Sequence, residues 1–351
     1  MVLNVIVPVY NGARYIADAL HSILDYREQA SCAVNIVLIN DGSSDCSEEI
    51  CLDFSRRYKG ITYIYQTNKG VSAARNAGLC HVFENCADDD WIGFLDADDV
   101  WHPDWTTAVK QCQSSEADII GFGMAQSNER LELENEIIPE QRVLFGGADT
   151  AVSENRKSHF GSYLYRCGHL FNYEIFYIPG VTNGEDLMFK YCAFFAANKI
   201  EYCSGMLYIY RKNPHSVTNN LGNQALKYYD ILLKGWNGLL DWLAKRERTD
   251  DCVQMIAFAR KRNNCTCMYA ARSYCAWHNG SFQNFRRDII NGLMSQRLLH
   301  PVDYQDDAAL ARDYQCLMRF PKLFYIKFYL LGVRDKVKWY IKRILCLYAS
   351  K

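Results

Sequence analysis

Short apolar runs alternate with helix-compatible segments over the first 95 residues, and this alternation constrains the fold more than any other feature. Four runs have the length and composition of buried strands: residues 2–9, 34–39, 61–66 and 90–95. The segments between them are expected to be helical: 13–25, 46–58 and 71–84. This βαβαβαβ order predicts an α/β fold with a mostly parallel central sheet flanked by helices.

Polar residues follow three of these strands at the point where each strand ends. Tyr10-Asn11, Asp41-Gly42-Ser43 and Asp96–Asp99 come after the first, second and fourth strands. The carboxyl ends of parallel strands share one edge of a sheet, and ligands bind at that edge. We therefore expect these polar groups to meet at one binding site.

The sequence WIGFLDADD, residues 91–99, ends an apolar run in three carboxylates. Asp96 and Asp98 alternate along an extended chain, so both can face the same side. Two hard oxygen ligands suit Mg²⁺ or Mn²⁺ bound to a nucleotide diphosphate. The alternative is an ordinary acidic loop that caps the next helix near residues 103–104. We expect Asp99 to have such a capping role rather than to bind metal.

Other charged groups each have a functional and an ordinary interpretation. Asp41 would accept a hydrogen bond from a uracil imide, or it serves only the turn after its strand. Arg75 would contact a phosphate, or it pairs with Asp41 or Asp96. Glu185 and Asp186 follow a glycine and are expected to begin a helix. One of these carboxylates would take a proton from an acceptor hydroxyl, or both only complement the helix dipole.

The pattern changes after about residue 111. Residues 119–124 have the composition of a further strand, whereas 128–139 are polar and acidic and are expected to form a loop. Beyond about residue 224 the chain has the pattern of helices.

Composition and the N-terminal sequence limit the class of binding partner and the cellular compartment that we expect. The formal net charge of −1 over 351 residues argues against nucleic acid as a partner. The chain begins MVLNVIVPVY, without the features of a secretion signal, and no apolar stretch approaches the roughly 20 residues of a membrane-spanning helix. We therefore expect a cytoplasmic protein whose fifteen cysteines are unpaired thiols.

Six motifs occur in the order seen in family 2 glycosyltransferases with the GT-A fold, and the chain resembles that family over about residues 1–220. The motifs are IVPVYNGARYI, VLINDGSSD, KGVSAARNAG, FLDADDVWHPD, NGEDLMF and YRKNPHSVT. The resemblance implies an inverting transfer of a sugar from a nucleotide-activated donor. It also implies a GT-A domain, Rossmann-like, with its nucleotide-sugar-binding half in 1–110 and its acceptor-binding half in 111–220. A helical C-terminal region, 221–351, would follow.

The resemblance assigns roles to positions of this sequence. Asp186 matches the catalytic base, with Glu185 as its rival. Asp96 and Asp98 match the DxD pair that binds the ribose and a divalent metal, Mg²⁺ or Mn²⁺, on the diphosphate. Asn40 stands where the family often has a second aspartate. Further positions match contacts to the nucleotide sugar: Pro8, Tyr10 and Asp41 at the base and ribose, Arg75 at the nucleotide or diphosphate, and Tyr210, Arg211 and Ser216 near the diphosphate.

The implied function is transfer of a sugar, from a UDP-sugar or a related donor, to a hydroxyl of a glycan or lipid-linked glycan in polysaccharide biosynthesis. Two alternatives remain open. A nucleotidyltransferase would also use an aspartate pair at a sheet edge, but YNGARYI follows the first strand in place of a glycine-rich, basic phosphate loop. A catalytically inactive scaffold that binds nucleotide sugars would not need DxD, GED and Arg211 together.

Residues 319–351 contain nine Lys/Arg and one acidic residue, Asp335, interleaved with aromatic and aliphatic side chains. Such a segment resembles an interfacial helix on an anionic membrane. It would hold the protein at the inner face of the plasma membrane, near a lipid-linked acceptor. The alternative is a terminal helix that packs on the catalytic domain and exposes a basic face to solvent.

Overall fold

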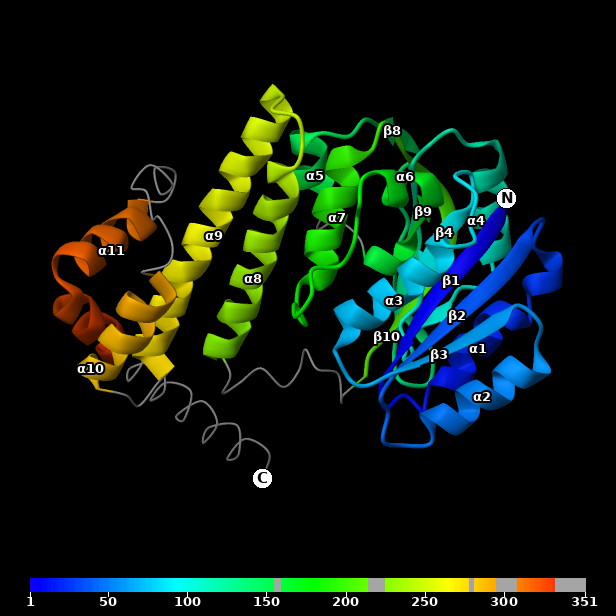
Figure 1. Cartoon of the computed structure of the whole chain (residues 1–351), viewed down its shortest axis with the longest axis horizontal. Helices are drawn as coiled ribbons and strands as arrows, with labels where there is room; N and C mark the ends of the chain where they lie inside the picture. Colours follow the sequence, from blue (N-terminus) through cyan, green and yellow to red (C-terminus); the bar gives the residue numbers. More distant parts are fainter. Residues whose placement is uncertain (155–158, 214–224, 278–280, 295–307, 332–351) are drawn as a thin grey trace. The chain divides into compact units, whose positions relative to one another are not determined.

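The computed structural model describes residues 1–154, 159–213, 225–277, 281–294 and 308–331. The chain divides into two compact units (Figure 1). The first contains Met1–Ser216 and Lys245–Cys252, and the second contains Val217–Ala244 and Val253–Lys351. The division into halves at residues 110 and 111 stays a prediction, and the first unit spans that boundary.

The first unit is built on one sheet with helices between its strands. The strands are β1 (Val2–Val9), β2 (Ala33–Asp41), β3 (Ile61–Gln66), β4 (Trp91–Phe94), β5 (Val100–Trp101), β6 (Ile119–Ser127), β7 (Leu133–Ile137), β8 (Arg142–Leu144), β9 (Tyr163–Arg166) and β10 (Ile200–Arg211). The helices are α1 (Ile16–Leu24), α2 (Ser47–Arg57), α3 (Val71–Phe83), α4 (Trp105–Ser114), α5 (Ala148–Glu154), α6 (Cys167–Asn172) and α7 (Glu185–Ala196), with short 3-10 turns η1 (Arg27–Gln29) and η2 (Phe160–Ser162).

The expected parallel sheet forms the first half of this sheet. Its strand order is β3-β2-β1-β4, and each pair in it is parallel, with α1, α2 and α3 as the connections. The second half continues the order as β9-β6-β10-β5 and is mixed. There β9 runs antiparallel to both β4 and β6, whereas β6 and β10 are parallel.

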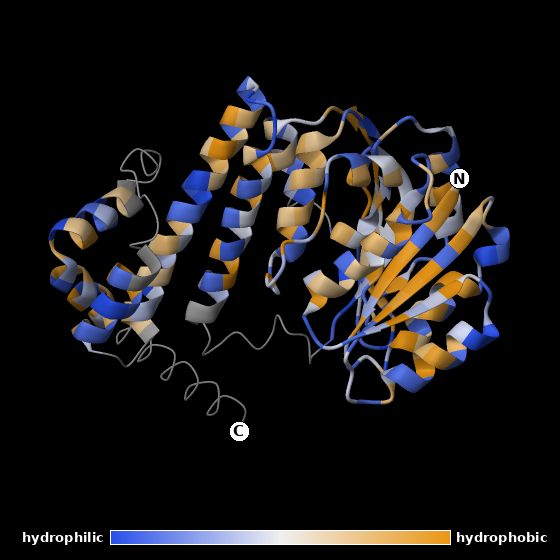
Figure 2. Cartoon of the chain, in the orientation of Figure 1, coloured by the Kyte–Doolittle hydropathy of each residue, from blue (hydrophilic) through white to orange (hydrophobic). Residues whose placement is uncertain are grey.

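Both faces of β1 are buried, which explains its continuous apolar sequence. Leu3, Val5 and Val7 pack into one core with α1, α2 and α4. Ile6 points to the other face, where a Cβ placed on Gly78 of α3 would lie 2.6 Å from its Cγ2 atom. Helix α3 therefore lies very close to the sheet, because Gly78 has no side chain. Figure 2 shows β1 and β2 as largely hydrophobic strands.

Two expectations about this unit were wrong. Residues 128–139 are not only a loop, since they contain β7, which pairs antiparallel with β6. All five residues of β7 are exposed, so no apolar alternation marks it in the sequence. The cysteines are not all unpaired, because Cys86 and Cys167 form a disulfide. The pairing of β9 with β4 brings Cys167, which follows β9, to the turn after α3.

The second unit is helical, as predicted from its sequence. Its described elements are α8 (Ala225–Ala244), most of α9 (Asp250–Trp277), α10 (Phe282–Phe285), a π-helix (Arg286–Met294), α11 (Ala308–Arg319) and a helix over residues 321–331. Tyr274, Phe285, Leu317 and Phe324 belong to one buried core that joins α9 to the later helices. Among the described helices, none is both long and apolar enough to cross a bilayer.

Candidate functional site

The loops after β1, β2 and β4 meet at one edge of the sheet, as the strand order predicts. The backbone N–H of Ser44 donates to Asn11 Oδ1 at 2.8 Å, and the N–H of Gly12 donates to Ser47 Oγ at 2.8 Å. A Cβ placed on Gly12 would lie 3.2 Å from the Cβ of Ala97. The aspartate loop after β4 therefore lies against the loop after β1.

Pro8, Tyr10 and Asp41 lie on this edge in different environments. Pro8 is buried within β1, whereas the side chain of Tyr10 is 54% exposed. The buried carboxylate of Asp41 accepts hydrogen bonds from Gln66 Nε2 at 2.6 Å and from the N–H groups of Lys69 and Gly70, both at 2.8 Å. These bonds order the turn that leads into α3. A contact from Asp41 to a nucleotide base stays a prediction.

Arg75 of α3 is buried between two carboxylates from other elements. Its Nη2 donates to Asp96 at 2.7 Å and its Nη1 donates to Glu185 at 2.9 Å. The guanidinium also lies over the ring of Phe160, 4.4 Å from the ring centroid. Burial lowers the pKa of Arg75, but the nearby carboxylate of Asp96 more than offsets this, so the pKa is raised and the side chain stays charged. Of the two interpretations of Arg75, the ion pair with Asp96 is present, and a contact with the nucleotide or diphosphate stays a prediction.

Asp99 does not cap the next helix, and that expectation was wrong. Its carboxylate is buried, where it accepts hydrogen bonds from the Tyr208 hydroxyl at 2.5 Å and from the N–H of Arg211 at 2.8 Å. The residue before α4 is Asp104, which makes no capping bond with its side chain. Strand β10 returns beside β5 and brings Tyr208 and Arg211 to Asp99, a contact that the local sequence does not contain.

Asp98 and Asp99 lie in an environment with excess negative charge. Asp98 accepts a hydrogen bond from Asn213 Nδ2 at 3.1 Å. Burial raises the pKa of both carboxyls, and neighbouring carboxylates, including that of Asp96, raise it further. A bound cation at this position would relieve that repulsion.

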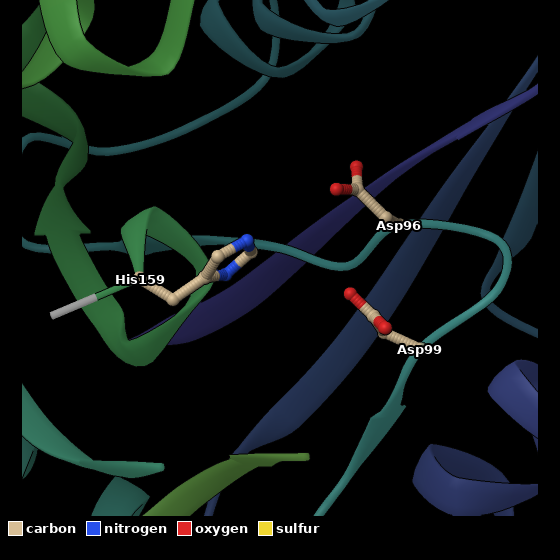
Figure 3. Close-up of side chains that lie close together, drawn as sticks. All are labelled: Asp96, Asp99 and His159. Atoms are coloured by element: carbon tan, nitrogen blue, oxygen red, sulfur yellow. The ribbon is translucent and has the colours of Figure 1, made fainter. Parts of the chain in front are cut away.

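His159 projects its ring toward Asp96 and Asp99 from the start of η2 (Figure 3). One potential ligand atom from each of these three residues lies within 4.8 Å of the other two. Burial lowers the pKa of His159 to about 4, so its imidazole is neutral near pH 7. Two carboxylates and a neutral imidazole are a donor set that divalent cations accept. No local motif marks His159, so the sequence alone does not identify it.

Glu185 and Asp186 form the first turn of α7, as predicted, after Gly184 in the left-handed region at φ 75°. Glu185 is engaged by Arg75. Among the described residues, none makes a hydrogen bond or ion pair with the half-buried carboxylate of Asp186. The positive end of the helix dipole favours a carboxylate at this position.

Lys190 lies one turn further along α7 and is a second group that the sequence does not mark. Its side chain is buried near the ring of Tyr163, with Nζ 5.3 Å from the ring centroid. Burial lowers the pKa of Lys190 to about 8, and the nearby carboxylates of Asp186 and Glu154 oppose that shift. The amine of Lys190 is therefore close enough to the carboxylate of Asp186 for the two charges to interact.

Tyr210 and Arg211 end β10. The ring centroid of Tyr210 lies 5.7 Å from that of His159. Tyr210 therefore lies next to one member of the group formed by Asp96, Asp99 and His159. The buried guanidinium of Arg211 donates to Asp18 of α1 at 2.9 Å and lies over the ring of Tyr15, 5.0 Å from its centroid. Arg211 is thus bound to α1, and its contact with a diphosphate stays a prediction. Ser216 lies outside the described residues.

Comparison with known proteins supports the fold. Residues 4–163 match the family described as Glycosyl transferase family 2. The chain is 31% identical to the uncharacterized glycosyltransferase EpsJ of Bacillus subtilis over 225 residues, which are 62% of each chain. It is 28% identical to the minor teichoic acid biosynthesis protein GgaA of Bacillus subtilis over 194 residues, 53% of this chain and 42% of that protein. The match therefore spans less than two thirds of either relative.

Among solved structures, the chain is similar to Staphylococcus aureus TarS 1–349 in complex with UDP-GlcNAc. The TM-score is 0.63 at 16% identity, and the match covers 96% of this chain and 92% of that one. A strand order of β3-β2-β1-β4 with an acidic loop after β4, together with this likeness, defines a domain of the GT-A fold. Residues 4–163 of the chain are thus similar to glycosyltransferase family 2.

Proposed function

We propose that the protein is an inverting, metal-dependent glycosyltransferase that transfers a sugar from a UDP-sugar to a hydroxyl of a glycan or lipid-linked glycan in polysaccharide biosynthesis. The main observation in support of this proposal is that Arg75 forms ion pairs with both Asp96 and Glu185. Arg75 joins the aspartate loop, through Asp96, to the start of α7, where Asp186 lies next to Glu185. A site for the donor diphosphate and a site for proton removal are therefore connected through one side chain. The similarity to a structure that binds UDP-GlcNAc and to a teichoic acid biosynthesis protein supports the donor and acceptor classes.

The acidic loop fits a divalent cation, Mg²⁺ or Mn²⁺. The crowded carboxylates of Asp96, Asp98 and Asp99 and the neutral imidazole of His159 supply oxygen and nitrogen donors. Asp96 and Asp98 are the ligands expected from the DxD motif, and Asp99 with His159 is the set that the structure places beside Asp96. Such a cation, when bound, neutralises the charge that develops on the departing diphosphate.

Asp186 is proposed as the base. Its carboxylate would take the proton from the acceptor hydroxyl as that oxygen bonds to the anomeric carbon and the bond from that carbon to the diphosphate oxygen breaks. The attack comes from the face opposite the leaving group, so one displacement inverts the anomeric centre. Glu185 is the less suitable base, because its carboxylate is held by the Arg75 guanidinium at 2.9 Å.

A thermal-shift panel of UDP-, GDP- and dTDP-sugars, each with and without Mn²⁺, tests the donor and the metal together. We expect a UDP-sugar to raise the melting temperature only when Mn²⁺ is present, because a ligand that binds the folded state alone stabilises it. Asp96→Asn should remove this shift. Absence of metal-dependent stabilisation by every donor would contradict the proposal.

Comparing Asp98→Asn, Asp99→Asn and His159→Gln in the same assay distinguishes the two ligand sets. If Asp98 is the metal ligand, Asp98→Asn removes the Mn²⁺-dependent shift while His159→Gln retains it. If Asp96, Asp99 and His159 bind the metal, His159→Gln removes the Mn²⁺-dependent shift and Asp98→Asn retains it. Asp99→Asn should also lower the melting temperature without any ligand, because Asp99 accepts bonds from Tyr208 and Arg211.

A further inference from the structure

The helix over residues 321–331 in the second unit has one buried face and one exposed apolar face. Phe324 is fully buried and packs against Phe285, with ring centroids 6.2 Å apart. Leu323, Ile326 and Leu330 are 59%, 42% and 59% exposed. Their spacing of three and four residues places them on the same side of the helix. The helix is therefore anchored through Phe324 and presents an aliphatic stripe outward.

Basic side chains border this stripe. Arg319 and Lys322 are exposed, and Lys327 is exposed while its Nζ pairs with Asp313 at 2.6 Å. Residues 319–331 contain these three basic residues and no acidic residue. An aliphatic stripe with cationic edges is the pattern of helices that lie in a membrane interface. The long stems of lysine and arginine cover apolar surface while their charges reach the headgroups.

A groove of about 520 Å³ adjoins the stripe within the same unit. Phe282, Ile290, Phe320 and Leu323 supply apolar walls, and Arg286 and Lys322 add two cationic groups. Arg286 and Lys322 are both exposed. Two cations beside an apolar wall match a phospholipid, whose phosphate joins the polar headgroup to the apolar chains.

We propose that the stripe and the groove form a docking surface for an anionic phospholipid bilayer. Leu323, Ile326 and Leu330 enter the headgroup boundary, and the basic side chains around them bind lipid phosphates. The surface makes a peripheral contact, since none of the described helices can span a bilayer. This proposal does not depend on the sugar transfer proposed above.

Charge distinguishes the bilayer from two other occupants of the same surface. In a symmetric dimer, the basic edges of the two copies would face each other, because a two-fold interface uses the same surface on both copies. Residues 332–351 of this chain carry six Lys/Arg and one aspartate, so they would bring positive charge to an already positive surface. An anionic bilayer is the occupant with complementary charge.

Sedimentation of the full chain with lipid vesicles tests the proposal. We expect the chain to sediment with phosphatidylcholine vesicles that contain phosphatidylglycerol, and at least tenfold less with phosphatidylcholine alone. Raising the ionic strength to about 1 M should weaken the binding, because the Debye length falls to about 3 Å. Equal binding to both vesicle types, or no binding, would overturn the proposal.

Two variants test the stripe and the cations separately. Leu323→Ser/Ile326→Ser/Leu330→Ser and Arg286→Glu/Lys322→Glu should each reduce vesicle binding at least tenfold. The matched control is Val143→Ser/Phe145→Ser, which removes two exposed apolar side chains from the first unit and should leave binding unchanged. Circular dichroism checks that each variant keeps its helices, as expected for exposed positions.

The other occupants give different results. If a second copy covers the stripe, the wild-type chain is a dimer without lipid, and the serine variant is a monomer with undiminished vesicle binding. If residues 332–351 cover it, a chain that ends at residue 331 binds vesicles and the full chain does not. Either result would overturn the proposal.

Discussion

The buried guanidinium of Arg75 donates a hydrogen bond to the carboxylate of Asp96, with 2.7 Å between the two atoms. The residues come from α3 and from the loop after β4, and Glu185 at the start of α7 binds the other side of the same guanidinium. One cation thus holds three elements at the edge of the sheet. The positions of the aspartate loop and of the proposed base depend on it.

Replacing Arg75 with Met should lower the free energy of unfolding of the first unit by about 3 kcal/mol, because two carboxylates lose their buried counter-charge. Urea unfolding followed by tryptophan fluorescence measures this change. Arg57→Met is the matched control, since Arg57 pairs with Asp53 on the exposed surface at 2.9 Å, and it should change stability little. Similar midpoints for both variants would show that the Arg75 network does not hold the site together.

Asp186→Asn and Glu185→Gln should separate the base from the structural carboxylate. Asp186→Asn should reduce the rate of transfer by about 10² or more, since the proton acceptor is lost, and should leave donor-induced stabilisation intact. Glu185→Gln should retain most of the transfer rate but unfold at lower urea, because its bond to the Arg75 guanidinium weakens. The opposite pattern in the transfer rates would move the role of base to Glu185.

Lys190 should make stability depend on pH in the alkaline range. The pKa of Lys190 is about 8 in the folded protein, below its ordinary value of 10.5, because burial opposes the charge. Between these values the unfolded chain holds a proton that the folded chain has released, so stability rises with pH. Relative to Lys190→Met, the wild type should gain about 2–3 kcal/mol from pH 8 to pH 10. Parallel stability profiles of the two proteins over this range would contradict the shift.

Gly78→Ala should destabilise the protein, although alanine is the better helix former by about 1 kcal/mol. The added Cβ would lie 2.6 Å from Ile6 and 2.9 Å from Ile39, and overpacking of this kind costs about 1–3 kcal/mol. Gly205→Ala is the control, because its Cβ would approach no atom closer than 3.9 Å. A melting temperature for Gly78→Ala at or above that of the wild type would show that α3 can move away from the sheet.

The sequence alone determined the parallel half of the sheet and the edge at which the candidate site lies. Strands buried on both faces must be continuously apolar, so β1 and β2 are visible in the composition of residues 2–9 and 34–39. The polar residues at their ends indicate the edge, because parallel strands end on the same side. The pairing of Arg75 with Asp96 was also among the predicted alternatives, since both lie at elements that this sheet brings together.

Only the tertiary structure decided which other side chains lie beside the aspartates of the candidate site. Asp99 meets Tyr208, 109 residues further along the chain, because β10 returns beside β5. His159 reaches Asp96 from η2, just before β9, the strand that pairs with β4. Neither contact leaves a local pattern in the sequence, because its partners are brought together by strand pairing in the mixed half of the sheet. The apolar periodicity of a sequence indicates which residues are buried. Which residues from different strands contact one another depends instead on the order of the strands in the sheet.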